Sequence, residues 1–291
     1  MALFGWRKDK YDYRDYLHKP KLVKIPLSAD LSHLLPDVRN QGQVQSCVGF
    51  GIGANLCSIA KNLNIFTEWY SPTWIYNGAR FIEGTLTQDV GCWPRDALDW
   101  LLKSGCLLEH FWPYDSNKLD FSAPSSEKQK QATKYPNFAY YRIGDGVNGI
   151  CSAIAEGHLV SIGTPWFNKW YYQNPIEGIL PEVTENDVFI GGHETCIYAY
   201  NLDTGYVYGI NSWGVEWGKN GLFAMPMSAF EVFKQLGGYD AHYITFEASI
   251  TPPEPPSPEP SECIIGNGIA GFLNVYSRLA KRRGRFYYLN K

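Results

Sequence analysis

Two short motifs in opposite halves of this 291-residue chain constrain its fold more than any other feature. Gln41 stands six residues before Cys47 in the first motif, and the second combines His193, preceded by two glycines, with Asn211 at the start of the string NSWGVEWGKNG. His193 lies 146 residues after Cys47, and Asn211 lies 18 residues after His193. A thiol, an imidazole and an amide act together only within hydrogen-bonding reach. The spacing therefore predicts a fold whose two halves meet at one site.

The first motif places Cys47 where a thiol is easily ionised. An ordinary cysteine has a pKa of about 8.5 and is mostly protonated at neutral pH, but the unpaired N–H groups at the start of a helix favour an anion. His193 would take the thiol proton and later give it to the leaving amine. The apolar residues that predict this helix recur at steps of three and four: Val48, Ile52, Leu56, Ile59 and Leu63.

Asn211 and Gln41 would complete the catalytic set. The amide oxygen of Asn211 can accept a hydrogen bond from the ring of His193 without adding a charge. Trp213, two residues later, would cover that bond and exclude water. The side-chain NH2 of Gln41 and the backbone N–H of Cys47 are the expected donors to the oxyanion of a tetrahedral intermediate.

These motifs, in this order, resemble the papain family of cysteine proteases, and the resemblance runs with gaps from about Gly5 to about Glu247. It implies an α+β fold of two lobes. A helical lobe would carry Cys47, a β-barrel-like lobe would carry His193 and Asn211, and the substrate cleft would lie between them. The implied activity is hydrolysis of peptide bonds in a polypeptide substrate.

The resemblance also suggests residues that line the cleft, and it has departures. Glu194 stands where the family commonly has a small residue, so the specificity is expected to differ. Val44 replaces a cysteine that usually forms a disulfide, and Val48 replaces an aromatic residue. The expected substrate-binding residues are Gly91, Trp93, Gly163, Gly192, Glu194 and Trp213.

Each motif also has a purely structural interpretation, and other functions stay open. Cys47 could be a structural cysteine, His193 a loop histidine and Trp213 a core aromatic residue. One alternative to a peptidase is a catalytically idle papain-fold protein with a binding or structural role. The other is an amidase or acyl transferase that uses the same residues on a non-peptide substrate. The intact set of Gln41, Cys47, His193 and Asn211 favours the enzyme, because a binding module has no need of all four.

Sequence patterns predict helices in the first half and strands in the second. Ser71 followed by Pro72 is typical of a helix start, so a helix is expected over residues 72–81. A second helix is expected over residues 94–105. Strands are expected over residues 158–163, 194–201, 206–210, 221–226 and 240–248.

Composition excludes several classes of function. The net charge of -3 argues against general affinity for nucleic acid, and no apolar run is long enough to span a membrane. No C-x-x-C or H-x-x-x-H spacing occurs, so neither metal nor cofactor is expected. The charged first 15 residues do not fit a secretory signal, which favours a cytoplasmic location, or a virion component if the source is viral, and reduced cysteines.

The chain divides into three expected parts. Residues 1–250 would form the peptidase domain, with residues 1–36 as a strap and without the long helical propeptide of family zymogens. Residues 251–260 are a proline-rich linker. Residues 261–291 form a basic, aromatic tail that could dock a protein, a nucleic acid or an anionic surface. The sequence leaves the oligomeric state open.

Overall fold

The structure is a computed structural model that describes residues 4–13, 15–22, 24–144, 146–171 and 176–248. The expected linker and tail lie outside these residues. In chain order the elements are β1 (Ser28–Asp30), η1 (Ser32–Leu34), α1 (Cys47–Asn62), α2 (Pro72–Glu83), α3 (Pro94–Ser104), η2 (Glu109–Phe111), α4 (Ser126–Gln131), β2 (Ala139–Arg142), α5 (Gly146–Ala155), β3 (Val160–Phe167), α6 (Asn168–Tyr171), η3 (Ile176–Gly178), β4 (Phe189–Asn201), β5 (Tyr206–Ile210), β6 (Leu222–Pro226), α7 (Ala229–Gln235) and β7 (Asp240–Thr245).

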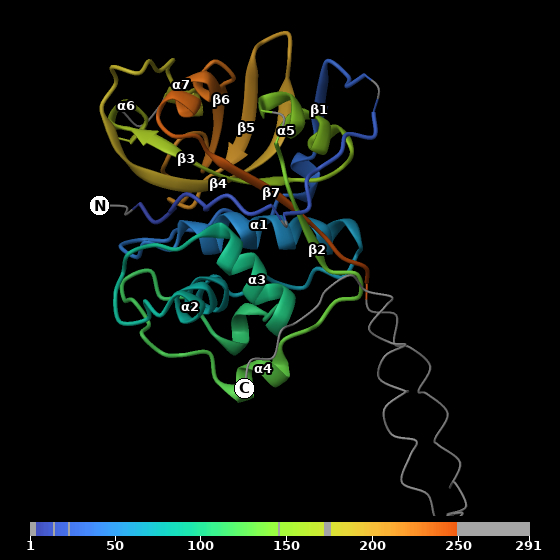
Figure 1. The fold of residues 1–291 in the computed structure, drawn as a ribbon, viewed down its shortest axis with the longest axis vertical. Coiled ribbons are helices and arrows are strands. Elements are labelled where there is room, and N and C mark those ends of the chain that lie inside the picture. The colour runs from blue at the N-terminus through green and yellow to red at the C-terminus, as the bar shows by residue number, and fades with distance from the viewer. Residues whose placement is uncertain (1–3, 14, 23, 145, 172–175, 249–291) are drawn as a thin grey trace, which may run out of the picture. The chain divides into compact units, whose positions relative to one another are not determined.

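Two hydrophobic cores arrange these elements into two lobes. One core lies around α1, α2 and α3, and the other lies around the antiparallel sheet with α5, α6 and α7. The sheet has the strand order β2-β7-β3-β4-β5-β6, and β1 pairs with β4. Figure 1 shows the sheet lobe above the helical lobe, with α1 between them. The α+β class and the two-lobed architecture expected from the sequence are therefore confirmed.

Local sequence explains the helices of the first lobe. The Ser71 hydroxyl accepts a hydrogen bond from the backbone N–H of Trp74 at 3.1 Å, Pro72 takes the first position, and left-handed Gly84 ends α2. Helix α3 begins at Pro94 as predicted and stops before Gly105. The predicted start of α1 at Cys47 is also confirmed.

The five predicted strands are present as β3 to β7, with different ends in all but β5, whereas β1 and β2 were not predicted. Strand β4 begins at Phe189, five residues before the predicted start, so His193 lies inside a strand and not in a loop. Strand β3 extends beyond Gly163 to Phe167. These additions pair with each other, because Thr164 faces His193 and Pro165 faces Gly192 in the register. The glycines and proline that obscured the strand signal are held by this pairing.

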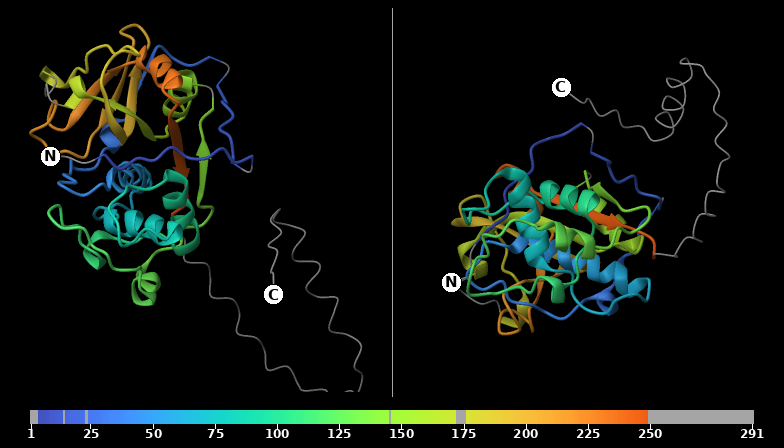
Figure 2. Two further views of the ribbon diagram at one scale, coloured as in Figure 1. Left: turned by 60° about the vertical axis from the view of Figure 1, so that its left-hand side comes forward. Right: turned by 90° about the horizontal axis from the view of Figure 1, so that it is seen from below.

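Glycine residues on α1 let the sheet lobe come close to the helix that carries the thiol. A Cβ atom at Gly51 would lie 2.8 Å from Cγ of Glu194, closer than real contacts allow. Strand β4 therefore runs directly against α1, which brings the segment around His193 next to the start of the helix. Figure 2 shows the same apposition of the two lobes from other sides.

The cysteines and helices of the described residues add two findings. The six cysteines present in this part of the chain are all unpaired and buried: Cys47, Cys57, Cys92, Cys106, Cys151 and Cys196. Within the same residues, no helix is long and apolar enough to cross a membrane.

Candidate active site

The imidazole of His193 is held by the amide of Asn211. Its Nε2 atom lies 2.7 Å from Asn211 Oδ1, which also accepts the backbone N–H of Ser212 at 2.7 Å. The Asn211 oxygen can only accept, so Nε2 must carry the ring proton. In the neutral ring the other nitrogen, Nδ1, is then the basic one. Nδ1 has no hydrogen-bond partner among the described residues.

The Cys47 thiol lies at the start of α1, next to the backbone of β4. Burial raises its pKa to about 12, against the lowering effect of hydrogen bonds from the backbone N–H groups of Glu194, Gly5 and Val48. Burial likewise lowers the pKa of His193 to about 4, although its bond to Asn211 acts in the opposite direction. The expected thiolate is therefore not favoured in this state, because both groups are completely buried.

Trp213 and Gln41 flank the histidine and the cysteine. The Trp213 indole stacks on the His193 ring with centroids 4.4 Å apart and an angle of 28° between the planes. Gln41 is buried, and its Oε1 accepts the Ser212 hydroxyl at 2.7 Å while its Nε2 donates to the carbonyl of Val44 at 2.8 Å. Ser212 therefore fixes which end of the Gln41 amide is the donor end.

A short stretch of the chain itself covers this site. We call residues 4–9 the cleft segment. Its Trp6 N–H donates to the carbonyl of Gly192 in the sheet lobe at 3.0 Å. On the helical side, Cys92 donates to the carbonyl of Gly5 at 2.9 Å and accepts from the N–H of Arg7 at 3.1 Å. Figures 1 and 2 show this blue stretch passing between the two lobes beside α1.

The side chains of the cleft segment fill the same space. Phe4 packs edge-on against His193 and Trp213, with centroids 6.1 and 6.0 Å away. The Arg7 guanidinium lies 3.4 Å from the ring centroid of Trp93. The backbone hydrogen bonds of the segment thus resemble those of an extended bound peptide. The Gly5 carbonyl, however, accepts its hydrogen bond from the N–H of Cys92 and not from the Gln41 amide.

The predicted cleft residues gather around this segment. A Cβ atom at Gly91 would lie 2.0 Å from the Gly5 oxygen, and one at Gly163 would lie 2.0 Å from the Trp6 indole nitrogen. Gly192, Trp93 and Trp213 contact residues 4–7 as described above. Glu194, the sixth predicted residue, directs its backbone N–H at Cys47 and is itself buried.

The sequence did not identify the cleft segment or the acidic residue Asp240 as parts of the site. A strap was expected over residues 1–36, but the sequence assigned none of its residues to the cysteine. In the structure, Gly5 directs its backbone N–H at the Cys47 thiol and Phe4 packs against His193. The tight glycines Gly5, Gly91 and Gly163 were a usable signal, since each leaves room for close backbone approach.

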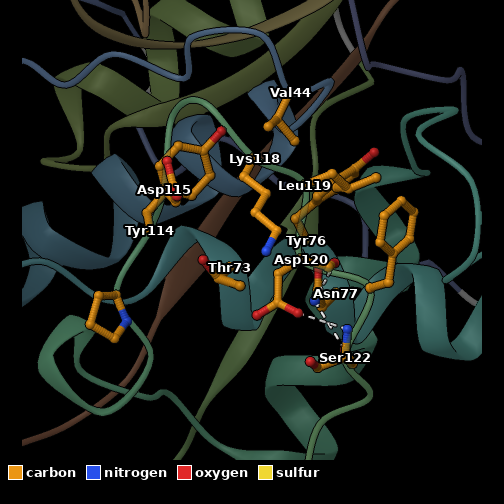
Figure 3. A pocket seen from close by; sticks show the side chains of 12 residues that line it. Val44, Thr73, Tyr76, Asn77, Tyr114, Asp115, Lys118, Leu119, Asp120 and Ser122 are labelled. Atoms are coloured by element: carbon orange, nitrogen blue, oxygen red, sulfur yellow. Dashed lines mark hydrogen bonds between the residues drawn. The ribbon is translucent and has the colours of Figure 1, made fainter.

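A separate cavity of about 630 Å³ lies in the helical lobe, and Figure 3 shows the side chains that line it. Its lining includes Tyr76, Tyr114 and Lys118 but neither the thiol nor the imidazole of the candidate site. Tyr114 links it to the site by donating its hydroxyl to the Gln41 carbonyl at 2.7 Å. The cavity wall therefore supports the loop before Cys47, and we assign it no chemistry.

The cleft segment is expected to hold less firmly as the pH rises from 6.5 to 8. Burial, together with the negative charge of Asp240, raises the pKa of Asp9 from 3.8 to about 8. In the covered state Asp9 therefore keeps a proton that it loses when the segment is released. The resulting stabilisation of the covered state is complete below pH 3.8 and is lost as the pH rises to about 8. Burial lowers the pKa of His242 to about 3, which opposes the effect only below its ordinary pKa of 6.5.

The measurement is the rate at which iodoacetamide alkylates Cys47 in the unmodified chain, divided by the rate in Asp9→Asn at each pH. Dividing the two rates removes the pH dependence of the thiol itself, which is the same in both proteins. Asparagine is used because it imitates the protonated carboxyl of Asp9. One released proton corresponds to a rise of up to about tenfold per pH unit. A ratio that stays constant between pH 6.5 and 8 would show that Asp9 does not control the cover.

Comparison with known proteins places the chain among cysteine proteases. The family model described as papain family cysteine protease matches residues 25–234. An uncharacterized peptidase C1-like protein of Acanthamoeba polyphaga mimivirus is 27% identical over 252 residues, which cover 77% of this chain and 81% of that protein. The cathepsin B-like protein CP3 of Giardia intestinalis is 27% identical over 203 residues, covering 66% of this chain and 64% of that protein.

Solved structures agree with the sequence relatives. Xylellain, a cysteine protease from Xylella fastidiosa, has a TM-score of 0.75 and 25% identity, covering 84% of this chain and 96% of its own. Digestive procathepsin L 3 of Tenebrio molitor, at 18% identity, shares the fold with a TM-score of 0.64, covering 80% of this chain and 74% of its own. The match over most of the chain and the two-lobed fold lead to one conclusion: this chain belongs to the papain family of cysteine proteases.

Proposed function

We propose that the chain hydrolyses peptide bonds with Cys47 as nucleophile and His193 as its base. The observation that carries the proposal is the arrangement of the imidazole. The bond from Nε2 to Asn211 assigns the basic lone pair to Nδ1, and Nδ1 has no other partner among the described residues. An imidazole so oriented can accept the thiol proton and form a thiolate–imidazolium pair once the site is hydrated.

The remaining residues take roles that follow from their bonds. After the thiolate attacks the substrate carbonyl, the negative oxygen would be stabilised by the backbone N–H of Cys47 and the side-chain NH2 of Gln41. Ser212 donates to Oε1 of that amide, which leaves Nε2 as its donor end. The His193 imidazolium then protonates the leaving amine, and water hydrolyses the acyl-enzyme with the same imidazole acting as base.

The cleft segment must leave before any substrate binds. Its backbone occupies the partners that an extended substrate would use on both lobes, and its residues bury the thiol and the imidazole. Opening would rehydrate both groups and remove the desolvation that keeps them neutral. The covered chain is thus a latent form in this proposal.

Alkylation of the full chain tests the proposal. In Trp6→Ala, which loses the largest side chain of the segment, iodoacetamide is expected to modify Cys47 about tenfold faster or more than in the unmodified chain. Cleavage of a fluorogenic peptide amide should fall in proportion to the Cys47 modification measured by mass spectrometry. Tyr13→Ala, which removes an exposed aromatic residue nearby, is the matched control and should change neither rate.

Three outcomes would argue against the proposed function. If Cys47 reacted no faster than buried Cys57 in Trp6→Ala, the thiol would not be activated. Fast labelling without cleavage of any amide would favour the idle binding protein. Cleavage of a simple acyl amide but of no peptide would favour an amidase or acyl transferase.

A further inference from the structure

We propose that residues 16–27, which lie between the cleft segment and β1, are a docking surface for an anionic phospholipid membrane. We call these residues the basic run. The inference goes beyond the proposed peptidase function, because it concerns the surface to which the chain binds and not the bond that it cleaves. Three observations carry it: the composition of the run, the exposure of its side chains and the way in which its backbone is held.

The basic run combines lysine with leucine and contains no acidic residue. Its sequence is YLHKPKLVKIPL, in which three lysines stand among apolar residues. The chain as a whole, by contrast, has a net charge of -3. The positive charge of the run is therefore a local feature, and an anionic surface would be attracted to this stretch and not to the chain as a whole.

Large apolar side chains of the run face solvent. Leu27 is 61% exposed, Tyr16 is 58% exposed and Leu17 is 57% exposed, and Leu22 is exposed as well. Apolar residues scattered singly over a protein surface are ordinary, but four of them within twelve residues form a patch. Such patches mark sites where a protein binds another protein or a membrane.

The lysines of the run are free to meet an anionic partner. Lys19, Lys21 and Lys24 are all exposed, and none of them has an ion pair within the part of the chain that the structure describes. The carboxylate of Glu156 lies close by, but it accepts the backbone N–H of Lys21 at 2.7 Å and is not paired with the ammonium group. The three charges are thus not neutralised by the protein itself.

The backbone of the run is held on the sheet lobe. His18 donates its N–H to the carbonyl of Arg142 at 2.7 Å near the start, and Leu27 accepts the N–H of Leu202 at 2.8 Å at the end. Between these two bonds lies the one to Glu156. Figure 2 shows this blue stretch following the outside of the molecule. Because the backbone is already ordered, binding through its side chains would cost little conformational entropy.

The leucines favour a lipid surface over a nucleic acid. Aliphatic side chains gain free energy at the boundary between headgroups and acyl chains, while nearby lysines attract the anionic headgroups. Tyrosine, as at position 16, is enriched at that boundary. Single-stranded nucleic acid is held instead by stacking on aromatic side chains, and Tyr16 is the sole exposed aromatic residue among the described residues of the run.

Sedimentation of the full chain with vesicles tests the proposal. The probes are vesicles of phosphatidylcholine alone and vesicles that also contain about 30% phosphatidylserine, which carries the anionic charge. We expect at least about tenfold tighter binding to the anionic vesicles, and weaker binding as salt screens the lysines. Replacing all three lysines of the run by glutamine should lower the affinity about a hundredfold, at about fivefold for each lysine.

Matched variants assign the binding to the run. Three exposed lysines of the helical lobe, changed together, remove the same charge and should leave binding near that of the unmodified chain: Lys103→Gln, Lys130→Gln and Lys134→Gln. Leu17→Ser with Leu27→Ser should lower the affinity about tenfold, because the apolar contact is lost. Ile179→Ser with Leu236→Ser, which changes two exposed apolar residues elsewhere, should not. Circular dichroism confirms that each variant is folded.

Four results would overturn the proposal. The first is an unmodified chain that does not sediment with anionic vesicles. The second is an equal loss of affinity in the two lysine variants, which would show attraction of charge in general. The third is a lysine variant of the run that binds like the unmodified chain, which would place the binding elsewhere. The fourth is unchanged binding in the leucine variant together with tighter binding to a single-stranded oligonucleotide, which would favour nucleic acid as the partner.

Discussion

Replacing Cys47 by alanine is expected to abolish cleavage of peptide substrates, with a fall in kcat/KM of about 10⁴-fold or more. His193→Ala should cost nearly as much, because a nucleophile and its base act as one unit and removing either removes the pathway. Asn211→Ala should cost less, since the imidazole keeps its basic nitrogen and loses only its orientation. The measurement is kcat/KM for a fluorogenic peptide amide in the Trp6→Ala background, in which the cleft is expected to be open.

Cys57→Ala provides the matched control for this prediction. Cys57 lies on the same helix, is just as completely buried, and has its pKa raised to about 12 by the same desolvation. It lies outside the candidate site, so its removal should leave turnover close to that of the background. Wild-type turnover in Cys47→Ala, with circular dichroism unchanged, would refute the peptidase assignment.

The second large effect is expected for Gln41→Ala, which should lower kcat about 10²–10³-fold with little change in KM. A donor aimed at the oxyanion acts mainly in the transition state, where the negative charge develops. Ser212→Ala should also lower kcat, but by less, because the Ser212 hydroxyl holds the Gln41 amide at 2.7 Å.

Two further measurements separate this role from others. Gln43→Ala changes an exposed glutamine in the same loop and should have no effect. The rate of Cys47 alkylation should be equal in Gln41→Ala and its parent, because the thiol and imidazole are intact. A change confined to KM would instead place Gln41 in substrate binding and exclude the oxyanion role.

Much of the fold follows from local sequence, and the residues explain why. The start of helix α2 was predictable because Ser71 and Pro72 are suited to a helix start, whereas its end at Glu83 lies two residues beyond the predicted one. The start of β4 was not, since Gly191 and Gly192 have low strand propensity and are held extended only by pairing with β3. Pairing between distant strands overrides propensity, and a single sequence does not reveal it.

The candidate site divides in the same way. Cys47, His193, Asn211 and Gln41 stand in recognisable strings whose order and spacing predicted a common site, and the predicted bond between His193 and Asn211 is present at 2.7 Å. The cleft segment has no periodic pattern, and its position depends on contacts with Cys92 and Gly192 that are far away in the chain. Asp240 likewise belongs to the site only because the strand register places it opposite Gly163.

The cleft segment also has a consequence for the chemical lifetime of the nucleophile. Peroxide oxidises cysteine through its thiolate, and the irreversible sulfinic and sulfonic acids follow the first step. Beneath residues 4–9, Cys47 is both protonated and out of contact with solvent. In the opening proposed above, the sulfur that becomes available to a peptide becomes available to peroxide at the same moment, so each such opening would expose Cys47 to permanent oxidative inactivation.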